Sequence, residues 1–84
     1  MTVEDVFSIT GRGTIVTGRV TAGVVAVGDR VLLSRAGQPL VQIEIGGIEM
    51  FRKTVDIAKA GDNVGLLLRG LQRDQVLKGD VLSK

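Results

Sequence analysis

Glycine spacing constrains the fold of this chain more than any other sequence feature. The 84 residues contain twelve glycines and one proline, so the segments between glycines are short. This spacing leaves little room for a long helix and is typical of short strands joined by turns. Seven segments have strand character: residues 3–9, 14–20, 30–34, 40–45, 48–51, 63–69 and 80–83. One helical turn is predicted at residues 73–77, so the predicted fold class is all-β.

Apolar residues within these segments follow the two-residue period of a strand. In residues 40–45 every second side chain is aliphatic, which gives an apolar face made of Val41, Ile43 and Ile45. In residues 14–20 one face holds Ile15, Thr17 and Arg19, and the other holds Val16 and Val20. Residues 64–68 are apolar on both faces, which predicts a central strand. Glycine at 28, 37 and 79 predicts tight turns before or between strands.

Several short strands leave exposed sheet edges unless the sheet closes on itself. The hydrophobic fraction of 44% is large enough for one aliphatic core. We therefore expect a single domain over residues 1–84, folded as a small closed antiparallel β-barrel of about six to seven short strands.

Composition argues against catalysis. The chain has no cysteine and no histidine, which removes a thiol nucleophile, a cysteine zinc site and the commonest general base. Its carboxylates accompany no nucleophile–base pair and form no calcium-loop pattern. We expect no enzyme activity, no metal and no cofactor. The absence of a long apolar run and of a signal-peptide pattern favours a soluble, cytoplasmic protein without membrane contact.

The glycines at 11, 13 and 18 superficially resemble a phosphate-binding loop. A P-loop requires Gly-Lys-Ser/Thr after the four intervening residues, whereas Arg19 and Val20 follow Gly18 here. Gly11-Arg12-Gly13 is better explained as a hairpin turn between two strands, so this chain is not expected to bind GTP.

Three longer stretches together carry a family resemblance: GRGTIVTGRV at 11–20, GIEMFRK at 47–53 and AGDNVGLLLRG at 60–70. In this order they resemble the β-barrel second domain of translational GTPases, a barrel of the translation-factor and reductase type. The first and third stretches resemble several relatives, including the selenocysteine-specific factor and archaeal initiation factor 2 gamma. The second points to elongation factor Tu. Residues 34–45 follow no pattern of that family, and Gly46 stands where a threonine or similar residue is expected.

The resemblance implies a pocket for the aminoacylated 3′ end of transfer RNA, lined by Glu49, Phe51, Arg52 and Asn63. Phe51 offers a stacking face and Arg52 a planar cation. Glu49 offers an acceptor for a 2′-hydroxyl, and Asn63 can donate and accept beside an α-amino ester. The alternative is structural: Phe51 belongs to the core, Arg52 to a solvated turn, and Asn63 to a turn that bonds its own backbone.

Three further arginines, Arg12, Arg19 and Arg69, are candidates for contact with RNA, including ribosomal RNA by resemblance. The alternative is that they form surface ion pairs with Glu4, Asp5 or Asp29, which would contribute little stability. The net charge of +2 is too small for general coating of nucleic acid, so any contact must come from locally placed arginines.

Two functions remain open. The leading hypothesis is a non-catalytic binding module of translation elongation, in which the GTPase domain of a parent factor supplies most of the affinity. Its own binding to RNA would be weak and sensitive to salt. The alternative is an engineered or reconstructed stand-alone scaffold with no ligand, in which exposed apolar surface leads to self-association.

Overall fold

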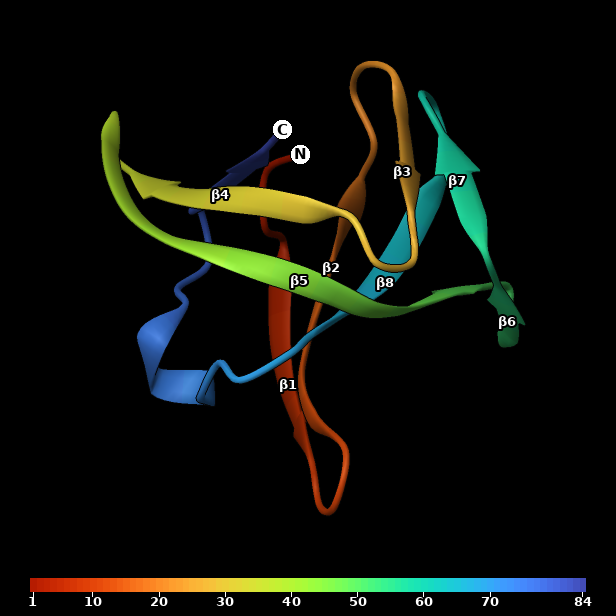
Figure 1. Cartoon of the computed structure of the whole chain (residues 1–84), viewed down its shortest axis with the longest axis horizontal. Coiled ribbons are helices and arrows are strands. Elements are labelled where there is room, and N and C mark those ends of the chain that lie inside the picture. The colour runs from red at the N-terminus through yellow and green to blue at the C-terminus, as the bar shows by residue number, and fades with distance from the viewer.

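The computed structural model describes all 84 residues, and it is built almost entirely of strands (Figure 1). The helical turn predicted at residues 73–77 is a short 3₁₀ helix, η1 (Arg73–Gln75). The strands are β1 (Asp5–Ile9), β2 (Gly13–Arg19), β3 (Val24–Ala26), β4 (Arg30–Arg35), β5 (Gln38–Met50), β6 (Lys53–Val55), β7 (Ile57–Lys59), β8 (Asn63–Leu68) and β9 (Val81–Ser83). The all-β prediction is confirmed. No helix is long and apolar enough to span a membrane.

The main sheet has the antiparallel order β1-β2-β8-β5-β4-β9, and β6 pairs with the far end of β5. In Figure 1, β5 runs across the molecule from the β4 hairpin to β6. Its first half pairs with β4 and its second half with β8 and β6. Strands β3 and β7 form a separate two-stranded sheet. The sequence did not predict β3, β6 or β7, because each has only three residues and a weak local pattern.

Strand β5 corrects the prediction of two separate strands at 40–45 and 48–51. The register with β8 shifts between Ile45 and Gly47, so Gly46 forms a bulge rather than a break. The side chain of Arg69 lies over this bulge: a Cβ at Gly46 would stand 2.8 Å from Arg69 Cγ. Glycine at this position therefore leaves room for the side chain of Arg69, the residue that follows β8.

The core is a cluster of sixteen buried aliphatic and alanine side chains. Strand β8 lies between β2 and β5 and contributes Val64, Leu66 and Leu68, which confirms the predicted central strand. The predicted alternation in β5 holds for Ile43 and Ile45, which are buried. Val41 remains 42% exposed because it lies toward the free end of the β4–β5 hairpin.

The tight turns occur where the sequence predicts them. Ala36 and Gly37, with φ of 51° and 80°, form a two-residue connection between β4 and β5. Both angles lie in the left-handed region that such hairpins require. Gly28 and Gly79 have φ of 94° and 95°, in turns that precede β4 and β9.

The two ends of the main sheet are β1 and β9, and no strand ladder joins them directly. The segment before β1 lies between them. Thr2 forms a bridge with Val81, and the Leu82 amide donates to the Met1 carbonyl over 2.8 Å. On the other side the Glu4 amide donates to the Thr17 carbonyl of β2 over 2.8 Å. Main-chain hydrogen bonds of residues 1–4 thus reach β9 at one end of the sheet and β2, the neighbour of β1, near the other end.

An ion pair between the partly exposed Arg35 and the buried Asp80 fixes the C-terminal region to β4. Asp80 is only 2% exposed and accepts two hydrogen bonds of 2.9 Å from the Nε and Nη2 groups of Arg35. It also accepts a 2.8 Å bond from the Leu77 amide. The hydrogen bond from Arg35, followed by the bond from Leu77, holds the pKa of Asp80 below its ordinary value. The carboxylate therefore stays ionised although it is buried.

Candidate functional site

The outer face of the main sheet gathers most of the predicted site residues. Residues paired across a ladder point to the same face, so the row Asp5, Thr17, Gly65 and Glu49 shares one side of β1, β2, β8 and β5. Ile15 is on this side too, and although buried it stands outside the core cluster. This face is therefore the one turned away from the core.

Arg19 and Asn63 face each other at the end of the β2–β8 ladder. Since Arg19 follows Thr17 by two residues in β2, both Arg19 and Asn63 share the outer face. The sequence predicted this side of β2 correctly as the one holding Ile15, Thr17 and Arg19.

A shallow pocket of about 270 Å³ opens here, with Gly65 between Thr17 and Glu49 in the cross-strand row. A Cβ at Gly65 would stand 3.4 Å from Ile15 Cγ2, an ordinary contact, so the missing side chain leaves room at the centre of the row. The pocket is lined by Glu4, Thr17, Gly18, Glu49, Met50, Phe51, Asn63, Val64 and Gly65. Three predicted residues, Glu49, Phe51 and Asn63, therefore share one pocket.

Phe51 lies at the tip of the β5–β6 hairpin, where Met50 pairs with Lys53. Its side chain is 87% exposed, so the alternative that places Phe51 in the core is wrong. Phe51 and Arg52 have φ of 53° and 63°, which are left-handed conformations that glycine or asparagine normally adopts. Such backbone costs of order 1–3 kcal/mol per residue and tends to mark functional sites.

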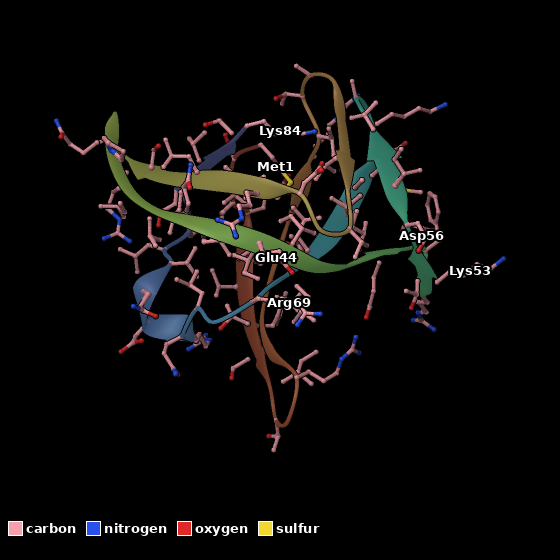
Figure 2. All side chains as sticks on the ribbon, in the orientation of Figure 1. Met1, Glu44, Lys53, Asp56, Arg69 and Lys84 are labelled. Atoms are coloured by element: carbon pink, nitrogen blue, oxygen red, sulfur yellow. The ribbon has the colours of Figure 1, made fainter.

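Arg52 shares this turn but does not line the pocket. It is exposed, and none of the ion pairs of the structure includes it. In Figure 2 the neighbouring Lys53 extends from the hairpin away from the body of the molecule. The turn thus presents one exposed aromatic ring and two cations beside the pocket.

Arg12 and Arg69 form ion pairs. Their partners are not the acidic residues expected from the sequence, which were Glu4, Asp5 and Asp29. Arg12 Nη1 lies 3.3 Å from Glu49 Oε1, and Arg69 Nε lies 3.3 Å from Glu44 Oε2 (Figure 2 labels the second pair). Arg19 belongs to no ion pair of the structure. The carboxylates of Asp5 and Asp29 instead lie near lysines: Lys78 at 4.0 Å and Lys84 at 2.9 Å.

Among the pocket residues with polar side chains, sequence reasoning missed two, Glu4 and Thr17. The signal for Thr17 was present, because alternation placed it on the same face as Arg19. Glu4 gave no local signal, since it lies just before β1 and reaches the pocket through the hydrogen bond of its amide to Thr17.

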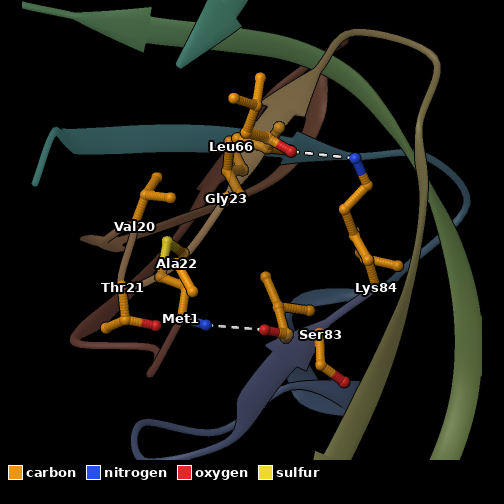
Figure 3. A pocket seen from close by; sticks show the side chains of 12 residues that line it. Met1, Val20, Thr21, Ala22, Gly23, Leu66, Ser83 and Lys84 are labelled. Atoms are coloured by element: carbon orange, nitrogen blue, oxygen red, sulfur yellow. Dashed lines mark hydrogen bonds between the residues drawn. The ribbon is translucent and has the colours of Figure 1, made fainter. Parts of the chain in front are cut away.

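A second, more apolar cavity of about 430 Å³ lies beside the two ends of the chain (Figure 3). Core side chains such as Val20 and Leu66 form part of its wall, and none of the predicted site residues lines it. Lys84 closes one side, where its Nζ donates to the Val24 carbonyl over 2.9 Å. The polar groups suited to recognition gather at the outer-face pocket instead, so we take that pocket as the site. No cluster of acidic side chains suited to a metal occurs.

Comparison with known families identifies the family of this chain. The family model described as elongation factor Tu domain 2 matches residues 13–83, which is nearly the whole chain. The matched span includes β2, the Phe51 hairpin and β8, and so it contains most of the pocket. Domain 2 is a non-catalytic domain, and the GTPase domain is not in these 84 residues. The chain therefore belongs to the elongation factor Tu domain 2 family.

Proposed function

We propose that this domain is a non-catalytic binding module of translation elongation whose outer-face pocket receives the aminoacylated 3′ end of transfer RNA. The observation that supports this most is the exposed, left-handed Phe51 turn beside a pocket that also holds Glu49 and Asn63. The Phe51 ring is exposed, and its backbone adopts a left-handed conformation that is unfavourable for phenylalanine, so the ring does not pack in the core.

Each group suits one part of an aminoacylated RNA end. The ring of Phe51 stacks on the terminal base, a contact worth about 1–3 kcal/mol. Glu49 accepts a hydrogen bond from a ribose hydroxyl, and Asn63 donates and accepts beside the aminoacyl ester. The room left by Gly65 accommodates part of the ligand between Thr17 and Glu49.

The arginines supply attraction for phosphate. Arg19 and Arg52 carry no ion-pair partner and are exposed, so they contact RNA without first breaking an ion pair. Arg12 and Arg69 exchange a carboxylate for a phosphate. With so few cations the isolated domain binds RNA weakly and salt weakens the binding further. We expect ribosomal RNA and the GTPase domain of a parent factor as further partners of this domain. We also propose that the protein acts in the cytoplasm.

The proposal includes closure of the sheet into a barrel. Residues 1–4 bond to β9 on one side and to β2 on the other, which supports closure through this segment instead of a direct β1–β9 ladder. Closure fixes Glu4 at the pocket and keeps the rows of the outer face in register.

The experiment is a titration of the ¹⁵N-labelled domain with a short CCA-ended aminoacylated RNA, followed by amide NMR. Amide shifts should concentrate at Glu49, Phe51, Arg52 and Asn63. The Phe51→Ala variant should lose them, whereas Leu40→Ala, eleven positions earlier on an exposed part of β5, should retain them.

A ligand-free scaffold that self-associates is the second candidate, favoured by the exposed apolar side chains outside the pocket. Unchanged pocket amides at saturating RNA would support the scaffold and contradict the binding module.

A further inference from the structure

The apolar cavity beside the chain ends reaches from the surface into the core (Figure 3). Its volume of about 430 Å³ lies within the range of small-molecule sites in proteins. Residues 21–24 are exposed and belong to its outer part. Its deeper wall is made of aliphatic side chains that also belong to the core cluster, namely Val20, Val25, Val31, Leu66 and Leu82. The cavity is therefore aliphatic inside and open to solvent on one side.

The deeper wall of this cavity suits a nonpolar group. No buried side-chain nitrogen or oxygen of the chain lacks a hydrogen-bond partner, so none there calls for a polar ligand. Water is held poorly against such a wall, because a buried water needs two to four polar partners. A dry apolar cavity of about 150 Å³ binds benzene, so this larger one has room for a longer nonpolar group. The body of a ligand here is thus an alkyl chain.

Lys84 is the one charged side chain in the lining. Its Nζ donates to the Val24 carbonyl over 2.9 Å and lies 2.9 Å from Asp29 Oδ2, a residue outside the lining (Figure 3 draws the first contact). These two contacts hold the ammonium group in place at the partly exposed side of the cavity. An ammonium has three N–H donors, so one remains for a further acceptor. The charge of this group favours an anionic head on the ligand.

We propose that this cavity binds an aliphatic carboxylate, with the alkyl chain against the aliphatic wall and the carboxylate beside the ammonium of Lys84. The carboxylate accepts the remaining N–H of Lys84 in a charge-assisted hydrogen bond. Removal of the alkyl chain from water supplies most of the affinity. The neighbouring carboxylate of Asp29 opposes the charge of the ligand, so a dissociation constant of about 1 mM is expected for an eight-carbon ligand.

The cavity is a separate site from the RNA pocket. The two share no lining residue: the cavity is bounded by β3, β4, β8 and β9, whereas the pocket lies on the outer face beside the Phe51 turn. Failure of this proposal would therefore leave the proposed function untouched, and the reverse also holds.

The test is a titration of the 84-residue chain with octanoate, followed by methyl NMR, with 1-octanol titrated in parallel as the neutral ligand of the same chain length. Octanoate should give nuclear Overhauser contacts to the methyl groups of Leu66 and Leu82, and it should bind more tightly than octanol. The buried methyl groups of Leu33 and Ile45 do not line the cavity and should give no contacts. Absence of cavity contacts at about ten times the expected dissociation constant would overturn the proposal, and so would equal binding of the alcohol.

Two variants should change the affinity for octanoate in opposite directions. Lys84→Met removes the cation but keeps a nonpolar side chain, so it should weaken octanoate binding by about two- to fivefold and leave octanol binding unchanged. Asp29→Asn removes the competing carboxylate and should strengthen octanoate binding. Lys78→Met makes the same charge change outside the cavity and should have no effect. Wild-type affinity of Lys84→Met for octanoate would overturn the proposal, as would weaker binding by Asp29→Asn.

Discussion

The guanidinium of Arg12 lies 3.3 Å from the carboxylate of Glu49 and so joins the β1–β2 turn to a pocket-lining residue of β5. The two residues are 37 positions apart, and both are candidates for contact with RNA. Glu49 therefore has a competing cation partner when no RNA is present. RNA binding that uses both side chains would replace this pair with two new contacts.

Arg12→Ala should change the free energy of unfolding by less than about 1 kcal/mol, because both members of the pair are solvent-exposed. The same variant should reduce the slope of log affinity for RNA against log salt by about one unit, as one phosphate contact is lost. Urea unfolding and titrations at several salt concentrations measure the two effects. An unchanged salt slope would remove Arg12 from the RNA surface.

Asp80→Asn should cost much more stability, about 2–3 kcal/mol, because it weakens the hydrogen bonds that Arg35 makes to a buried carboxylate. Glu44→Gln is the matched control, since it alters the exposed pair with Arg69 and should cost less than about 1 kcal/mol. Urea unfolding of both variants gives the comparison. Equal effects would show that burial of Asp80 has no energetic consequence.

The lowered pKa of Asp80 predicts the direction of acid unfolding. Because the folded-state pKa lies below the ordinary value of 3.8, the stabilisation is present above pH 3.8. It is lost as the pH falls through the lower folded-state pKa. The free energy of unfolding should therefore decline below about pH 4 in the wild type and decline less steeply in Asp80→Asn. Parallel slopes for the two proteins in urea titrations from pH 7 to pH 2 would contradict the assignment to Asp80.

Substitutions at two glycines should distinguish an effect on the stability of the fold from an effect on RNA binding at the pocket. A Cβ at Gly18 would lie 2.5 Å from the main-chain carbonyl oxygen of Thr2, which cannot move without shifting residues 1–4. Gly18→Ala should therefore cost at least about 1–3 kcal/mol. Gly65→Ala adds a Cβ at an ordinary contact distance, so it should fold normally but weaken RNA binding. Denaturant unfolding and NMR titration measure the pair, and normal stability of Gly18→Ala would contradict the role given to residues 1–4.

Arg52→Gly should stabilise the domain by about 1 kcal/mol, because glycine adopts a φ of 63° without steric cost. It should weaken RNA binding at the same time, since a cation beside Phe51 is removed. Thermal unfolding measures the expected gain in stability, and an RNA titration measures the expected loss of affinity. A loss of stability would show that the Arg52 side chain supports the hairpin.

Much of the fold could be predicted because its signals are local. The Ala36-Gly37 turn, the alternation around Ile43 and the apolar run of β8 all depend on residues within a few positions of each other. The bulge at Gly46 could not be predicted, because the side chain that lies over it belongs to Arg69, which follows β8 and is distant in the sequence. Pairing of β3 with β7 also joins distant three-residue segments that have no pattern of their own.

The candidate site was predicted in part for the same reason. Its motif residues Glu49, Phe51 and Asn63 could be named from the resemblance, and the structure brings them to one pocket. The apolar character of Phe51 left a core position open, whereas its place in the turn between β5 and β6 leaves it exposed. Pairing of Arg12 with Glu49 depends on how β1 and β5 are placed by two intervening strands, which no local pattern encodes.

The most direct test of the proposed function is the search for nuclear Overhauser contacts between the Phe51 ring and the terminal adenosine of an aminoacylated CCA oligonucleotide. Contacts are expected from the Phe51 ring protons to that base, and from Asn63 to the aminoacyl group. Contacts confined to arginines outside the pocket, or no contacts at an RNA concentration that saturates binding, would contradict it.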